Sequence, residues 1–266
     1  MAISVNELTR GAVIRKKDFI WEQSGPFSLA HPIRKELGSI NITGVVVDIP
    51  KGEIWTCCEM AKNQEVIVVI FSGGGKATIG DVSQTVEKNA SLYAPTGLAY
   101  SIEAAEETRI YIWQSDLLPG SKTSTSPRHF NHLFNNETIF EGFMGTDPTQ
   151  TNNSPANMNF LFWPGTGCSH LSLHCGIQEP GQNFGVHSHP ISEELFIGVE
   201  GKGQVHLDGE WIDFEEGDIL YSPENIYHGT RNPDVGLNAK RFVTCGGPVP
   251  FDVNFYTLAG LSPEVK

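Results

Sequence analysis

The chain has 266 residues, of which 39% are hydrophobic, and this length allows two domains with substantial cores. A formal net charge of −13 argues against nucleic acid and against an anionic membrane surface as partners. No apolar run approaches the length that a membrane-spanning helix needs, so we expect no membrane partner.

The N-terminus and the cysteines favour a cytoplasmic protein. The first ten residues, MAISVNELTR, lack the apolar core of a signal peptide. The five cysteines are an odd number, and two of them, Cys57 and Cys58, are adjacent. This pattern suggests no disulfide framework, and a reducing, cytoplasmic setting is the expectation.

Short strands dominate the predicted elements. The 28 Gly and 16 Pro separate many short Val- and Ile-rich runs, which is typical of an all-β barrel protein. In chain order we predict an N-terminal arm with short strands (1–40), a first barrel (41–116) and a Ser/Thr/Pro/Asn-rich linker (117–157). A second barrel (158–250) and a partly helical tail (251–266) follow.

The second predicted barrel carries a group of residues with metal-ligand chemistry. His187 and His189 are two positions apart, which places both side chains on one face of a strand. Glu194 follows a short turn, and His228 comes later. Imidazoles with one carboxylate suit a transition metal rather than Ca²⁺ or Mg²⁺. The sequence therefore predicts one divalent ion (Fe, Mn, Zn, Ni, Co or Cu) bound by His187, His189, Glu194 and His228.

The spacing of these residues resembles the two motifs of the cupin superfamily. The first motif is matched at Gly181, His187, His189, Glu194 and Gly201. The second is matched at Gly217, Pro223, His228 and Asn232, with Asn225 where Gly is usual. The resemblance implies tandem double-stranded β-helix (jelly-roll) barrels, a catalytic metal at an open barrel mouth, and a homodimer. The alternative is a closed, structural metal site.

A weaker copy of the motifs lies in the first half of the chain. A constant offset moves the first three ligand positions back onto Cys58, Met60 and Glu65, and an offset shorter by one moves the fourth onto Tyr100. The resemblance thus implies a bicupin whose first site is degenerate. Cys58 and Met60 are either buried filling or ligands of a softer metal. Glu65 is expected to face a water-filled cavity or to hydrogen bond with Tyr100, because a buried carboxylate needs a partner.

Three functional classes remain open for the intact site. The preferred class is an O₂-dependent dioxygenase that acts on a small polar or acidic organic molecule. The second is a non-redox metalloenzyme, namely an isomerase, a lyase, or an aminohydrolase similar in layout to ureidoglycine aminohydrolase. The third is a cupin that binds a small ligand without turnover. Oxalate decarboxylation is not expected, because Phe184 stands where the oxalate-handling bicupins have Arg.

Three residues are the candidates for catalysis. Glu194 is proposed to take up a proton besides binding the metal. His174 is a candidate for proton transfer. An Arg that points into a small barrel needs an anionic partner, so Arg241 is the candidate anchor for a substrate carboxylate.

Overall fold

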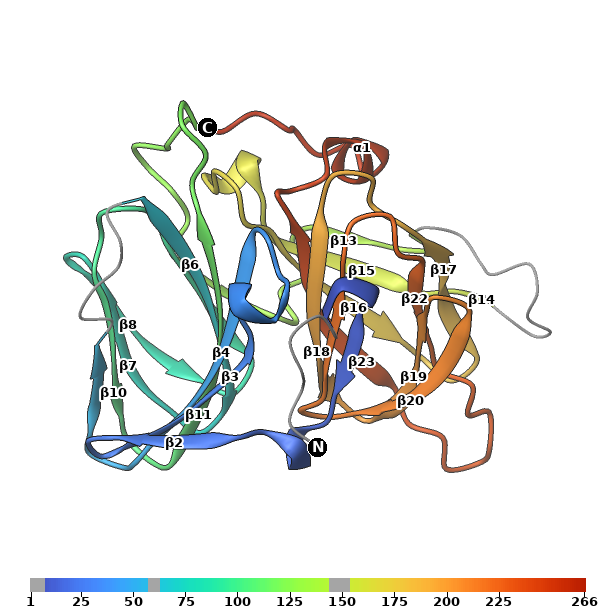
Figure 1. The fold of residues 1–266 in the computed structure, drawn as a ribbon, viewed down its shortest axis with the longest axis horizontal. Coiled ribbons are helices and arrows are strands. Elements are labelled where there is room, and N and C mark those ends of the chain that lie inside the picture. The colour runs from blue at the N-terminus through green and yellow to red at the C-terminus, as the bar shows by residue number, and fades with distance from the viewer. Residues whose placement is uncertain (1–7, 57–62, 144–153) are drawn as a thin grey trace.

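The computed structural model describes residues 8–56, 63–143 and 154–266. Two β-barrels lie side by side, one built mainly from each half of the chain (Figure 1). The predicted all-β architecture with two barrels in tandem is confirmed. Within the described ranges, no helix is both long and apolar enough to cross a membrane.

The first barrel consists of a seven-stranded and a four-stranded sheet. The larger sheet has the order β12 (Phe130–His132), β9 (Ala90–Ala94), β6 (Gln64–Ser72), β11 (Thr108–Asp116), β4 (Ile42–Ile49), β3 (Phe27–Ile33) and β2 (Trp21–Ser24). The smaller sheet has the order β5 (Ile54–Thr56), β10 (Tyr100–Ala104), β7 (Gly74–Ile79) and β8 (Val82–Glu87).

The second barrel consists of a seven-stranded and a five-stranded sheet. The larger has the order β1 (Ala12–Ile14), β21 (Ile219–Ser222), β18 (Glu193–Glu200), β23 (Phe242–Val249), β16 (Leu173–Gln178), β15 (Asn157–Phe162) and β13 (Ile139–Phe140). The smaller has the order β14 (Ser154–Pro155), β17 (Gln182–His187), β22 (His228–Arg231), β19 (Lys202–Leu207) and β20 (Glu210–Glu215). A short helix, α1 (Val253–Leu258), follows β23.

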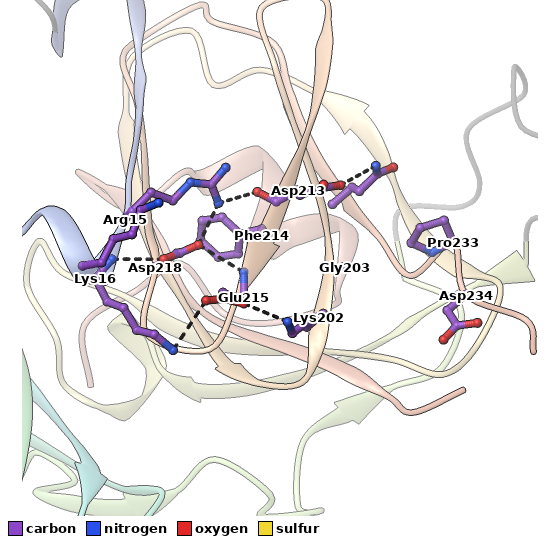
Figure 2. A pocket seen from close by; sticks show the side chains of 12 residues that line it. Arg15, Lys16, Lys202, Gly203, Asp213, Phe214, Glu215, Asp218, Pro233 and Asp234 are labelled. Atoms are coloured by element: carbon purple, nitrogen blue, oxygen red, sulfur yellow. Dashed lines mark hydrogen bonds and ion pairs between the residues drawn. The ribbon is translucent and has the colours of Figure 1, made fainter. Parts of the chain in front are cut away.

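The N-terminal segment contributes strands to both barrels. Strand β1 pairs antiparallel with β21 of the second barrel, whereas β2 and β3 extend the large sheet of the first. Next to β1, the Arg15 guanidinium donates to the Asp218 carboxylate at 2.7 Å, and the Lys16 backbone N–H donates to the same carboxylate at 3.0 Å. Figure 2 shows these contacts along a surface groove of about 550 Å³. The segment is therefore fastened to the second barrel by charge as well as by strand pairing.

Residues 117–157, predicted as a linker, also pair with both barrels. Strand β12 joins β9 in the first barrel, and β13 joins β15 in the second.

Strand alternation separates two kinds of core. On β6, Val66 and Val68 belong to the apolar interior of the first barrel, whereas Ile67 and Val69 pack between the two large sheets. The core between the barrels also contains Trp113, whose indole N–H donates to the carbonyl of Leu195 at 3.0 Å. The two barrels consequently share one continuous interface core.

Glu65 lies at this interface and not in the interior of the first barrel. Its carboxylate, fully buried, accepts the backbone N–H groups of residues 169–171, which belong to the second half of the chain. It also accepts the Tyr93 hydroxyl at 2.6 Å. The expected cavity or Tyr100 partner is therefore replaced by donors from across the interface.

Glu193 makes the reciprocal contact from the second barrel. Its carboxylate accepts the backbone N–H groups of residues 40–42 at 2.6, 2.8 and 3.2 Å, and the Tyr221 hydroxyl at 2.5 Å. Like Glu65 with Tyr93, Glu193 bonds a tyrosine that lies 28 residues further along the chain. The two buried carboxylates thus join the barrels in equivalent ways.

This equivalence corrects the comparison of the two halves by one position. Glu65 corresponds to Glu193, so the first-barrel counterpart of Glu194 is the next residue, Val66. Val66 and Tyr100 are both buried in the first barrel's apolar interior. Cys58 and Met60 lie outside the described residues. Within the described part of the first barrel, two of the four ligand positions are filled by residues of the apolar core.

Candidate metal centre

The four predicted ligands meet inside the second barrel. His187 ends β17, Glu194 is the second residue of β18, and His228 begins β22. One ligand atom from each of these residues and from His189 lies within 4.8 Å of the others. His189 was expected on the same strand as His187, but β17 ends at His187 and His189 lies in the loop before Pro190.

Hydrogen bonds at Nδ1 fix the orientation of the imidazoles. His187 Nδ1 contacts the Gly185 carbonyl at 2.9 Å, and His228 Nδ1 contacts the Ser222 hydroxyl at 2.9 Å. His189 Nδ1 is held by a carboxylate, which is described below. Such outer contacts leave the Nε2 atoms as the ligating nitrogens.

The Nε2 atoms are the reason why this cluster fits a metal ion. Those of His187 and His189 are buried, and that of His187 has no hydrogen-bond partner among the described residues. His228 Nε2 lies 2.6 Å from the Glu194 carboxylate, and His189 Nε2 lies 3.3 Å from it. Burying an unpaired imidazole nitrogen costs free energy, which a cation bound between these atoms would recover. Three imidazoles and one carboxylate match the preference of a divalent transition metal.

Burial and the contacts within the cluster shift the pKa values of its members in different directions. Burial raises the pKa of Glu194, but hydrogen bonds from three neighbouring imidazoles outweigh it and hold the pKa well below its usual range. Burial lowers the pKa of His189, yet its contacts with Asp252 and Glu194 raise it to about 9. Burial and the other two imidazoles lower the pKa of His187 to about 3. His187 is therefore neutral and able to act as a ligand.

The ligands open onto a small cavity with largely apolar walls. Its volume is about 30 Å³, which is room for roughly two water molecules or one small organic group. Met158, Phe184, Phe196 and Phe255 form its apolar walls. The register of β17 against β22 shifts between Phe184 and His187, and Phe184 lines the cavity.

Of the predicted catalytic residues, the structure brings His174 to the site but not Arg241. His174 lines the cavity, and its Nε2 lies 3.3 Å from Glu194 Oε1. Arg241 instead forms a two-pronged ion pair with Glu200 at 2.9 and 2.7 Å and lies over the Phe134 ring. The Arg241 side chain is 38% exposed, so the expected inward orientation is not found. Glu200 supplies the anionic partner that a substrate was expected to provide.

Two residues near the C-terminus complete the site and were not predicted. Asp252 hydrogen bonds with His189 Nδ1 at 2.8 Å and caps α1 by accepting the N–H groups of Asn254 and Phe255. The Phe255 ring is nearly parallel to the His187 ring, at 17° and 6.0 Å between centroids. An Asp before a predicted helix is a recognisable N-cap signal. The local sequence does not indicate which histidine that Asp contacts.

Replacing Asp252 with Asn should weaken metal binding without disturbing the helix. Asn is as good an N-cap as Asp, but it removes the charge that orients and polarises His189. We expect a 10- to 100-fold lower metal affinity, roughly the usual effect of losing such a partner. Competition with a chromophoric chelator would measure the affinity. Asp234→Asn, at an exposed loop position, is the matched control. Equal affinity for Asp252→Asn and wild type would remove this role.

The sequence comparisons match the second barrel. Residues 177–243 match the family model described as a cupin domain. Polyketide synthase CurC of Streptomyces cyaneus is 39% identical over 67 residues, which are 25% of this chain and 42% of that protein. The uncharacterized protein MJ1618 of Methanocaldococcus jannaschii is 31% identical over 77 residues, which are 29% of this chain and 60% of that protein. The matches thus span less than two thirds of either relative.

Similarity to solved structures extends over both barrels. A putative glyoxylate induced protein from Pseudomonas aeruginosa aligns with a TM-score of 0.71 at 15% identity, covering 95% of this chain and 93% of that one. A variant of oxalate decarboxylase from Bacillus subtilis aligns with a TM-score of 0.66 at 15% identity, covering 94% and 78%. Identities this low show the fold alone. The cupin-domain match of the second barrel and the two-barrel fold of the whole chain both support the resemblance to the cupin superfamily.

Proposed function

We propose that the second barrel is a metal-dependent catalytic centre for a small organic molecule, with O₂-dependent oxidation as its preferred reaction. The observation that supports this most is the buried, unpartnered Nε2 atom of His187, which lies close to the other ligand atoms at a cavity with apolar walls. A closed structural site would have no cavity beside its ligands. An apolar chamber also suits O₂, which is itself apolar.

A bound iron, manganese or copper ion would supply Lewis acidity and a redox couple. The chain's own residues set the conditions around it. Phe184, Phe196 and Met158 exclude bulk water from the cavity. His174 and Glu194 can hold or pass a proton between Nε2 and Oε1, which lie 3.3 Å apart. The cavity volume of about 30 Å³ restricts the substrate to a few non-hydrogen atoms.

Oxygen consumption would test the proposal directly. The metal content of the purified protein is determined first, and O₂ uptake is then followed with pyruvate, dihydroxyacetone and acetylacetone, which all enolise. We expect substrate-dependent uptake by wild type and at least about a 100-fold loss in His187→Ala, since a ligand is removed. Substrate turnover at an unchanged rate under argon would contradict oxidation.

The His174–Glu194 contact favours a second candidate, a non-redox isomerase or lyase. An imidazole beside a carboxylate is a common arrangement for moving a proton next to a carbonyl group. In this case, wild-type protein in D₂O under argon should exchange the α-protons of dihydroxyacetone, as followed by NMR. His174→Gln should slow the exchange by about 10²- to 10⁴-fold and keep its metal. Exchange at the wild-type rate in His174→Gln would exclude that role.

A further inference from the structure

The cavity beside the ligands has two hydroxyl groups in its wall. Thr230 on β22 and Thr244 on β23 both line it, and they are 5% and 6% exposed. No hydrogen bond to either hydroxyl is found among the described residues, and neither hydroxyl oxygen is completely buried. Two hydroxyl groups that reach one cavity and are not engaged by the protein are available to donate to, or accept from, a bound molecule.

Two glycines form part of the cavity wall near Thr244. A Cβ atom on Gly176 would lie 2.7 Å from the Phe184 ring and 3.2 Å from Thr244 Oγ1. A Cβ atom on Gly246 would lie 2.2 Å from the Leu195 carbonyl oxygen, a contact that no real side chain makes. Gly176 therefore lets the Phe184 ring lie beside Thr244, and Gly246 lets β23 lie close against β18 at the cavity wall.

The charge of the wall limits what this space can hold. The described residues that line the cavity include Glu194 but no Lys or Arg. A second carboxylate on a substrate would lose its hydration here without gaining a cation. A neutral hydroxyl or carbonyl group needs only a hydrogen bond, which a threonine provides.

We infer that Thr230 and Thr244 bind the neutral, oxygen-bearing end of a short substrate whose other end faces the His187–Glu194 cluster. This inference rests on the proposed function, because it assumes that the cluster holds an ion. The substrate class is then a short hydroxy- or oxo-monocarboxylate rather than a dicarboxylate. The threonines select the substrate, and the ligand cluster binds its carboxylate.

Three molecules of nearly equal size separate these classes. 3-Hydroxypropionate, propionate and malonate differ only in a terminal hydroxymethyl, methyl or carboxylate group. Each would be titrated into the cobalt(II)-loaded protein, with binding followed by the visible absorption of the cobalt ion. We expect 3-hydroxypropionate to bind about fivefold more tightly than propionate, which is the typical effect of one hydrogen bond, and malonate to bind most weakly.

Variants at the two threonines would show whether these residues cause the preference for 3-hydroxypropionate over propionate. The double variant Thr230→Val with Thr244→Val should bind 3-hydroxypropionate no better than propionate, because valine keeps the shape and removes both hydroxyls. The corresponding double serine variant should keep the preference. Thr78→Val, on β7 of the first barrel, is the matched control and should behave as wild type.

Different results would overturn this inference and the proposed function. Tightest binding of malonate, or a hydroxyl preference that survives in the double valine variant, would overturn the inference while leaving the metal centre intact. Absence of cobalt binding in wild type would overturn the proposed function, and this inference with it.

Discussion

Replacing His228 with Ala is expected to lower the metal content from one ion per chain to nearly none. The substitution removes one of three imidazoles and also the donor that lies 2.6 Å from Glu194. The remaining residues then offer an incomplete ligand set with an under-compensated buried carboxylate. Elemental analysis after gel filtration would measure the loss, and circular dichroism would show that the β-sheet fold persists.

Two control variants separate loss of the ligand from general damage to the barrel. His206 lies on β19, which pairs with β22; its Nδ1 contacts the Tyr227 carbonyl and its ring packs edge-on against Trp211. His206→Ala should keep its metal. Tyr100→Ala, at the equivalent of His228 in the first barrel, should also leave the metal content unchanged. One ion per chain in His228→Ala would mean that the ion is bound elsewhere.

Replacing either interface carboxylate with its amide is expected to cost about 3 kcal/mol of unfolding free energy. The Glu65 carboxylate accepts three successive backbone N–H groups and a tyrosine hydroxyl, and all of these are donors. The amide of Gln would place its own N–H₂ against one or more of them. Buried donors would then lose their acceptor, and the same argument holds for Glu193→Gln.

Urea unfolding monitored by tryptophan fluorescence would measure these changes. Glu210→Gln, at an exposed position, should change the unfolding free energy by less than about 0.5 kcal/mol. Tyr93→Phe and Tyr221→Phe, which each remove one hydrogen bond, should cost about 1 kcal/mol. A change below about 1 kcal/mol for both glutamate variants would show that the interface does not depend on these carboxylates.

The metal cluster could be predicted because most of its ligands lie close together in the sequence. The His187–His189 spacing and the turn to Glu194 need only strand and hairpin geometry. Arg241 could not be placed in this way, because its orientation depends on Glu200, 41 residues away in the chain. Asp252 was missed for the same reason, since it reaches His189 across 63 residues.

The position of Glu65 at the interface could not be predicted from the sequence for a different reason. A comparison of the two halves that is wrong by one position moves a side chain from one face of a strand to the other. The sequence allowed two alignments of the second half on the first, and their offsets differ by one residue. Glu65 and Glu193 both accept backbone N–H groups from the opposite half of the chain, which makes the shorter offset the correct one. These contacts become visible only in the folded chain.

The reciprocal carboxylates have the form of an isologous contact, in which each half presents the same patch to the other. The chain therefore resembles a homodimer made permanent by fusion of its two subunits. In the first barrel the interior position next to the interface is the apolar Val66, whereas Glu65 and Tyr93 at the interface make the same contact as Glu193 and Tyr221. A second copy of the chain would have to bind at another surface, because this one is already occupied within the chain.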